Sequence, residues 1–386
     1  MRDVVEIGIG REAARTFELE DITIVPSRPI CSHRDVSLDW QIDAYRFDMP
    51  IVGHPTDALA SPEFVIEMGK QGALGVFNGE GLWARWENPE EKIAQVREIA
   101  LSNDNPTVAV ALLQELNKEP IKKELLSAAV KKIHDSGVVT AVRVSPQRAR
   151  ELGPMLVDAG MDMLVVQGTL ISAQYMSDGT ELPLDIKDLV HGTDIPVVVG
   201  GCVNYHTAKH LMRTGAAGVI VGYGATEGIT TTGEVLGINV PMATAIADAA
   251  AARRDYMEET GGRYVHVIAS GDLNSSGDIA KAIACGADAV MAGPMLAQAQ
   301  ESAAHGVYWP TVAAHPANPR GAVVPVLDEY EAEGEEYSGP SLEVVLSGPS
   351  SEPFGTCDLA GGLRRSIAKC GYTTLKEFQR VQLSVH

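Results

Sequence analysis

The stretch Leu211-Met-Arg-Thr-Gly-Ala-Ala-Gly-Val-Ile-Val-Gly222 decides the fold class of this chain. It has the pattern of a helix end, a turning glycine at Gly215, a short apolar strand and a closing glycine. The strand, Ala216–Val221, carries no charged residue, which is typical of a parallel strand buried on both faces. The glycine-rich segment from Gly222 to Pro241 then follows. In α/β proteins, ligands bind at loops in this position.

The same pattern occurs twice more, in Met155–Gly168 and in Ala282–Gly293. The turning glycines of the three copies are Gly160, Gly215 and Gly286. Each interval between them is long enough for two strand–helix units, so the repeat marks alternate strands of a parallel sheet.

Counting the apolar runs between the amphipathic segments gives eight strands. Eight strand–helix units in one sheet predict a closed (β/α)8 TIM barrel, with a doubly wound open sheet as the alternative. The expected strands are Ile51–Gly53, Ala73–Phe77, Val138–Val144, Met163–Val166, Pro196–Val199, Ala216–Val221, Val265–Ala269 and Ala287–Met291.

The remaining segments are predicted to decorate one barrel domain that spans residues 1–386. An amino-terminal lead contains a short strand around Ile22 and Ile24, and residues 87–135 have a helical pattern. Residues 302–360 are expected to form a flap or lid, and residues 361–386 a helical tail. The acidic run at 328–336 within the flap reads as a solvated loop or as part of a lid over the barrel mouth.

Charge and composition exclude several classes of partner. The net charge of −20 argues against binding to nucleic acid or to anionic membrane surfaces, because it cannot neutralise phosphates in bulk. Five cysteines without paired spacing predict neither a metal site nor a disulfide framework, and they suit a reducing compartment. With no signal-peptide pattern and no apolar run of membrane-span length, we expect a cytoplasmic protein.

Four stretches resemble the IMP dehydrogenase/GMP reductase family: Glu20–Ser27, the segment from Gly222, Ser276–Gly293 and Gly361–Arg365. The chain is similar to the short actinobacterial relatives that lack the regulatory CBS module. The resemblance implies a barrel that binds a purine nucleotide at its carboxyl face, NAD as hydride acceptor, a role in guanine nucleotide metabolism, and a homotetramer.

The resemblance also implies site residues. In the family, a loop cysteine attacks the purine, and here Thr230 or Thr231 stands nearest to that position. The cofactor contacts carry over to Gln167 and Gly168. The implied substrate-binding residues are Asp57, Asn204, Gly222, Gly224, Gly228, Ser270, Gly271 and Gly293.

The chain departs from the family pattern at most of these positions. Ser270 replaces a ribose-binding aspartate, Asp272 replaces a glycine near the phosphate, and Pro294 replaces a phosphate-binding serine. Gln167 replaces an aspartate near the nicotinamide, and the flap carries Asn318-Pro-Arg-Gly321 without an Arg-Tyr pair.

Cys202, at the end of the predicted fifth strand, is the remaining candidate nucleophile, because strand ends on this face carry the catalytic groups of barrels. Its alternative role is that of a small buried side chain that only packs. His266 is expected to be a hydrogen-bonded core histidine rather than a base.

Three functional hypotheses follow. The first in rank is a diverged paralogue with weak or no IMP dehydrogenase activity, acting as a nucleotide-binding or assembly subunit. The second is an active NAD-dependent IMP dehydrogenase. The third is an oxidoreductase or lyase that acts on a different small molecule.

Overall fold

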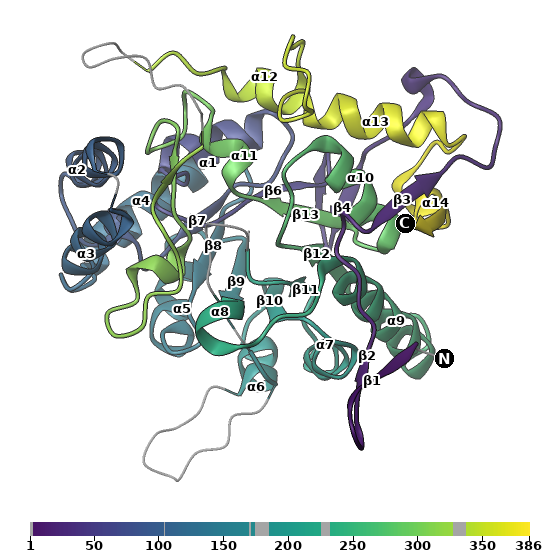
Figure 1. Cartoon of the computed structure of the whole chain (residues 1–386). Coiled ribbons are helices and arrows are strands. Elements are labelled where there is room, and N and C mark those ends of the chain that lie inside the picture. Colours follow the sequence, from purple (N-terminus) through teal and green to yellow (C-terminus); the bar gives the residue numbers. More distant parts are fainter. Residues whose placement is uncertain (1–2, 104, 170, 174–184, 225–231, 327–336) are drawn as a thin grey trace.

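The computed structural model of the chain is a (β/α)8 barrel with the strands at its centre and the helices around them (Figure 1). It describes residues 3–103, 105–169, 171–173, 185–224, 232–326 and 337–386. The eight parallel strands follow the order β6-β13-β12-β11-β10-β9-β8-β7 around the sheet. They are β6 (Ile51–Gly53), β7 (Val76–Asn78), β8 (Ala141–Val144), β9 (Met163–Gln167), β10 (Val197–Cys202), β11 (Gly218–Val221), β12 (His266–Ala269) and β13 (Ala289–Ala292).

The two ends of the sheet meet beside β6. A parallel bridge joins Val52 to Leu74, and the Gly53 amide donates to the Leu74 carbonyl over 2.8 Å. The prediction of a barrel is therefore confirmed, and the open doubly wound sheet is not what forms.

The eight predicted strands all occur, with small changes at their ends. The third begins at Ala141 rather than at Val138, since Val138 and Val139 pack against the core without joining the sheet. The repeat glycines do turn the chain, because Gly160, Gly215 and Gly286 have φ of 98°, 98° and 117°, which side chains rarely adopt.

Between each strand and the next, and after β13, at least one helix of the outer ring follows in the described chain, as the (β/α)8 pattern requires. The helices of this ring are α1 (Pro62–Lys70), α4 (Lys123–Asp135), α5 (Ala149–Asp158), α6 (Ile186–His191), α7 (Tyr205–Met212), α9 (Met242–Thr260), α10 (Ser276–Cys285) and α13 (Leu359–Lys369). Ser275, and not the neighbouring Ser276 of the resembling stretch, caps α10 by accepting from the Asp278 amide.

Two further helices, α2 (Pro89–Ser102) and α3 (Pro106–Leu116), lie with α4 in the segment 87–135, for which the sequence predicts a helical pattern. Beyond β13, the chain crosses the carboxyl end of the barrel through α11 (Pro294–Ala297) and a hairpin of β14 (Val307–Tyr308) and β15 (Val324–Pro325). No helix in the described part of the chain is long and apolar enough to cross a membrane.

The amino end of the barrel is closed by a hairpin of β4 (Trp40–Ile42) and β5 (Tyr45–Phe47), whose Ile42 side chain is fully buried. The tail ends in β16 (Gln382–Val385), which pairs with β3 (Ile22–Val25), the short strand expected around Ile22. The sequence predicts a helical tail over residues 361–386, and that pattern does not indicate the strand at its end.

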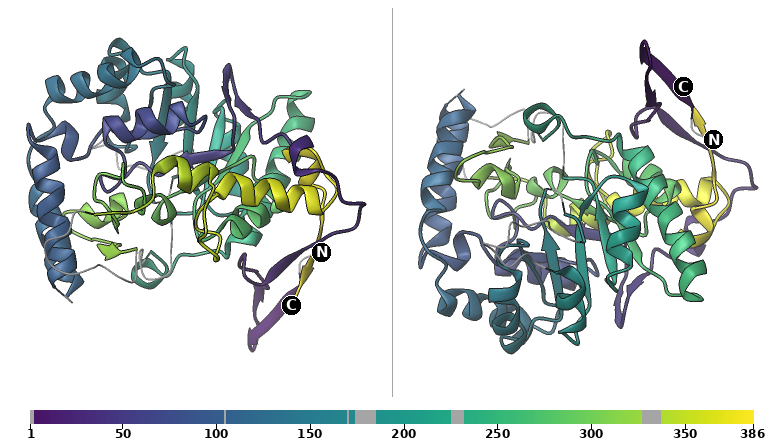
Figure 2. Two further views of the ribbon diagram at one scale, coloured as in Figure 1. Left: turned by 90° about the horizontal axis from the view of Figure 1, so that it is seen from above. Right: turned by 90° about the horizontal axis from the view of Figure 1, so that it is seen from below.

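A separate hairpin of β1 (Val4–Gly8) and β2 (Arg11–Ala14) extends away from the body of the molecule (Figure 2). Neither strand contains a buried residue, and Val4, Val5, Ile7 and Ile9 are exposed.

Candidate functional site

A cavity of about 890 Å³ opens at the carboxyl ends of β7, β8 and β9. Residues that follow these strands form one wall, and the segment after β14 forms the other through Trp309, Thr311, His315 and Arg320. The lining contains five cationic side chains and two carboxylates, although the chain as a whole carries −20. The cationic residues are Arg85, Lys118, Arg143, Arg148 and Arg320, and the carboxylates are Asp57 and Glu80.

Arg143 is the central cation of this cavity. It lies in β8, and its Nη2 donates to the Gln167 carbonyl oxygen over 2.8 Å. Its Nε is buried and has no hydrogen-bond partner among the described residues. Burial lowers the pKa of the guanidinium, but an arginine remains charged in proteins.

Asp57 is buried where the cavity meets the barrel. Its Oδ1 accepts from Asn78 Nδ2 at 3.4 Å, and the backbone of Leu82 also bonds the carboxylate. Burial raises the pKa of Asp57 to about 6, against the opposing effects of these bonds and of Arg85 and Arg143. A carboxyl group with this pKa exchanges its proton near neutral pH, as an acid–base catalyst does.

His54 lies next to this group and is not a base at neutral pH. Burial and then the charge of Arg143 lower its pKa to about 4, so the ring is neutral. Its Nδ1 lies 3.4 Å from the Tyr308 hydroxyl, which is also buried.

Gly222, Gly224, Ser270 and Gly271 come together at the ends of β11 and β12. The Gly224 amide donates to the Ser270 carbonyl over 2.8 Å, and a Cβ on Gly222 (φ 98°) would collide with that same carbonyl. The Ser270 hydroxyl is fully buried without a hydrogen-bond partner among the described residues.

Cys202 is located at the end of β10, as expected, but its thiol is fully buried. Its Sγ donates to the Ile220 carbonyl at 3.4 Å, and burial raises the pKa of the thiol to about 12. The cause is the loss of solvent around the sulfur. A thiol in this state is protonated and a poor nucleophile.

Two predicted substrate residues have structural roles in the described chain. Asn204 caps α7, because its Oδ1 accepts from the Thr207 amide at 2.9 Å. Gly293 precedes the four-residue helix α11, and the Tyr308 hydroxyl lies 2.5 Å from the place where a Cβ of Gly293 would stand.

The predicted cofactor residues border the cavity. Gln167 ends β9 and is buried, with its Oε1 unpaired among the described residues, while Gly168 lines the cavity directly. His266 accepts from Trp40 Nε1 at 3.2 Å at the opposite, amino end of the barrel, so the expected hydrogen bond is confirmed, although the residue is only half-buried. Gly228, Thr230 and Thr231 lie outside the described residues.

The sequence reasoning missed the basic lining, above all Arg143 and Arg85. A signal was present, since Arg143 is the only charged residue in the apolar run Val138–Val144. A charged residue in an otherwise apolar barrel strand indicates a ligand site when its side chain faces the barrel mouth.

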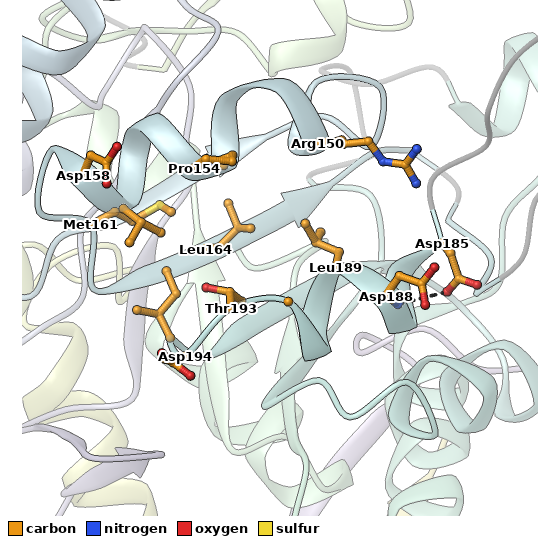
Figure 3. A pocket seen from close by; sticks show the side chains of 14 residues that line it. Arg150, Pro154, Asp158, Met161, Leu164, Asp185, Asp188, Leu189, Thr193 and Asp194 are labelled. Carbon is orange, nitrogen blue, oxygen red and sulfur yellow. Dashed lines mark hydrogen bonds between the residues drawn. The ribbon is translucent and has the colours of Figure 1, made fainter.

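A second concavity of about 490 Å³ lies outside the barrel, between α5 and α6 (Figure 3). Apolar side chains, including Met161, Leu164 and Leu189, form its floor, and aspartates stand at its edges. It contains none of the predicted site residues.

Comparison with known proteins gives the family. A sequence profile described as the IMP dehydrogenase / GMP reductase domain matches residues 14–385. A protein of Mycolicibacterium smegmatis named as an uncharacterized oxidoreductase is 61% identical over 382 residues, which cover 99% of this chain and 100% of the relative. An inosine-5'-monophosphate dehydrogenase of Methanocaldococcus jannaschii is 23% identical, over 95% of this chain and 92% of its own length.

Among solved structures, an IMP dehydrogenase/GMP reductase-like protein from Corynebacterium glutamicum superposes with a TM-score of 0.92 and 53% identity. The match covers 100% of this chain and 98% of that one. The chain therefore belongs to the IMP dehydrogenase/GMP reductase family.

Proposed function

We propose that this protein binds a purine nucleotide or a closely related phosphorylated molecule at the carboxyl end of its barrel, as a diverged family member with weak or no IMP dehydrogenase activity. The observation that carries the proposal is the set of buried polar atoms there that lack partners among the described residues. They are Arg143 Nε, Gln167 Oε1, Tyr223 OH, Thr232 Oγ1 and Ser270 Oγ. Buried polar groups are normally hydrogen-bonded, so atoms left unpaired at the carboxyl ends of the strands fit a ligand, and Arg143 among them lines the 890 Å³ cavity.

We propose weak activity because the described chain and the loop sequence offer no reactive nucleophile at the site. The segment Gly222–Pro241 contains no cysteine, and the thiol of Cys202 is buried and protonated. Thr230 and Thr231 remain the nearest substitutes on the loop, and a threonine hydroxyl attacks only with a strong base beside it.

We propose NAD as the cofactor and place it in the outer part of the same cavity. Arg148 and Arg320 can pair with a diphosphate, and Thr169 and Gly168 can approach a ribose or an amide. A volume of about 890 Å³ is near the upper end of the range of about 300–1,000 Å³ for ligand pockets. When bound, this cofactor would supply a hydride acceptor or donor.

Asp57 favours a second candidate function, namely an oxidoreductase that acts on a different small molecule. Its pKa of about 6, inside the cavity, suits a proton acceptor that does not depend on a cysteine. The mycobacterial relative named as an oxidoreductase is consistent with this candidate.

We further propose that the protein forms a homo-oligomer through the β1–β2 hairpin. An isolated two-stranded hairpin is marginally stable in water, and this one exposes Val4, Val5, Ile7 and Ile9. Packing of these side chains on a second copy would remove them from solvent. Sedimentation of the full chain and of a variant lacking residues 2–14 tests this, because the proposal requires the shortened chain to form smaller species.

NADH formation from IMP and NAD tests the proposed function. We expect rates near background for the wild type and for Thr230→Cys, because catalytic groups act as a unit and one restored member recovers little. Sustained turnover of IMP by the wild type would overturn the ranking and make the protein an active IMP dehydrogenase.

A further inference from the structure

Charge is distributed unevenly around the barrel mouth. The side formed by β7, β8 and β9, here called the basic half, carries Arg85, Arg143 and Arg148, which outnumber the carboxylates Asp57 and Glu80 on the same side. The side that follows β12, here called the acidic half, carries Asp272, two residues beyond Ser270, and Glu18, whose Oε2 accepts from the Met242 amide at 2.9 Å. Burial, and then the negative charges of Asp272, Asp21 and Glu20, raise the pKa of Glu18.

Within the basic half, two guanidinium groups bond to carbonyl oxygens and not to carboxylates. Arg143 Nη2 donates to the Gln167 carbonyl, and Arg85 donates to the carbonyls of Glu80 and Glu119. The nearby carboxylates have other partners, since Glu80 accepts from the Ser145 amide and Asp57 from Asn78. No ion pair joins either arginine to a carboxylate in the described ranges of the chain.

Arg143 and Arg85 are half-buried, and burial lowers the pKa of each guanidinium by more than the nearby charges of Glu80 and Asp57 raise it. An anionic ligand would supply further counter-charge. Arg143 lines the mouth cavity, and its Nε is left without a hydrogen-bond partner among the described residues, while its Nη2 is held by the Gln167 carbonyl. An arginine presents its Nε and Nη groups as a fork that matches the oxygens of a phosphate.

The other side of the mouth offers less to an anion. At the end of β13, the Tyr308 ring is buried against Gly293, and Pro294 has no N–H to donate. The carboxylates of Asp272 and Glu18 would repel a dianion that approached the end of β12.

We propose that the phosphate monoester of the ligand binds on the basic half, at Arg143 with Arg85, and not on the β12–β13 side. This inference rests on the proposed function, because it assigns the orientation of the ligand in the same cavity. The neutral part of the ligand then extends toward the unpaired hydroxyls of Ser270 and Tyr223.

The test measures binding of inorganic phosphate, IMP and neutral inosine by thermal shift and calorimetry at constant ionic strength. The proteins are the wild type, Arg143→Gln, Arg143→Lys and, as a matched control on the acidic half, Asp272→Asn. We expect Arg143→Gln to weaken phosphate and IMP about 10- to 100-fold, since a hydrogen bond to a charged group contributes ~1.5–3 kcal/mol. Arg143→Lys should recover part of this loss, and inosine should be affected little.

Without ligand, Arg143→Gln should melt at the same temperature as the wild type or higher, because burial disfavours the guanidinium charge by more than Glu80 and Asp57 favour it. A purely structural arginine would give the opposite change. The Arg143→Lys variant keeps the test valid if the glutamine variant does not fold.

The binding results distinguish a wrong phosphate position from a wrong proposed function. Phosphate and IMP binding that survives Arg143→Gln but responds to Asp272→Asn would overturn the orientation and leave nucleotide binding intact. Phosphate binding lost in Arg143→Gln, with no nucleotide bound by the wild type, would support the anion site and contradict the proposed function. Failure of the wild type to bind either probe at millimolar concentration would overturn both.

Discussion

Two aspartates, almost equally buried, lie at opposite ends of this barrel. Asp288, beside β13 at the amino end, is 2% exposed, and Asp57, at the carboxyl end, is 4% exposed. The carboxylate of Asp288 accepts from five groups, whereas that of Asp57 accepts a long bond from Asn78 and a bond from the backbone of Leu82. The donors to Asp288 are Arg253 at 2.5 Å, Lys376 and Tyr264 at 2.6 Å, the Val267 amide at 2.9 Å and Gln379 at 3.2 Å.

This difference in hydrogen-bond partners indicates that the amino end contributes to stability and the carboxyl end to function. At the amino end, the buried carboxylate of Asp288 has partners on α9, on β12 and on α14 (Leu375–Phe378), and others on residues adjacent to β12 and α14. These bonds hold the helices against the barrel. At the carboxyl end, polar atoms such as Arg143 Nε and Ser270 Oγ are buried without a partner among the described residues. In barrels, the carboxyl face is also where ligands bind.

The largest expected effect comes from removing the paired aspartate. Asp288→Ala should lower the free energy of unfolding by about 3–5 kcal/mol, because it leaves Arg253 buried without its partner. The matched change Asp57→Asn should leave the protein no less stable at neutral pH. Urea unfolding of the two variants measures both effects, and an equal loss in both would remove the distinction between the two ends.

The second effect is a pH dependence of the free energy of unfolding that comes from Asp57. Its folded pKa of about 6 lies above its ordinary value of 3.8, so the folded state holds the proton more tightly than the unfolded state. This contribution is complete below pH 3.8 and is lost as the pH rises through 6, a change of roughly 3 kcal/mol.

The wild-type stability relative to Asp57→Asn should therefore fall between these pH values and be flat above them. Unfolding curves of both proteins at several pH values measure the difference. A difference that rises with pH would mean that Asp57 is held as a carboxylate by cations in the fold.

A smaller effect is expected at two fully buried serines. The Ser270 hydroxyl has no partner in the described chain, whereas the Ser302 hydroxyl donates to the Ala297 carbonyl at 2.9 Å. Ser270→Ala should be neutral or stabilising by about 1 kcal/mol, and Ser302→Ala should be destabilising by about 1 kcal/mol. Thermal unfolding of both variants decides this, and the same loss in each would show that Ser270 has a structural partner.

The smallest effect concerns Cys202. Since its thiol is buried with a pKa raised to about 12, it should react with iodoacetamide more slowly than the half-buried Cys31. Peptide mass analysis after timed labelling gives both rates, and labelling in urea is the control for intrinsic reactivity. Fast labelling of Cys202 that a nucleotide blocks would restore it as a candidate nucleophile.

The sequence predicted the barrel well because each buried parallel strand must be apolar and must be preceded by a turn. Gly160, Gly215 and Gly286 mark those turns, and their positive φ values explain why the repeat is visible. The strand β16 could not be predicted in this way, because it pairs with β3 at the other end of the chain.

The site was harder to predict because its residues come from distant segments. Arg143, Asp57 and Arg85 meet only after β6, β7 and β8 align, and the pattern of Val138–Val144 does not say which way its charged side chain points. The burial of Cys202 depends on its packing against β11. Thr230, Thr231 and Gly228 stay predictions.

Calorimetric titration of the full chain with IMP, GMP, XMP and NAD tests the central claim most directly. The claim is that the unpaired groups at the carboxyl end form a ligand site. It predicts that at least one mononucleotide binds with one site per chain and raises the melting temperature, as any ligand selective for the folded state must. If none of the four binds at millimolar concentration and the melting temperature stays constant, the claim is contradicted.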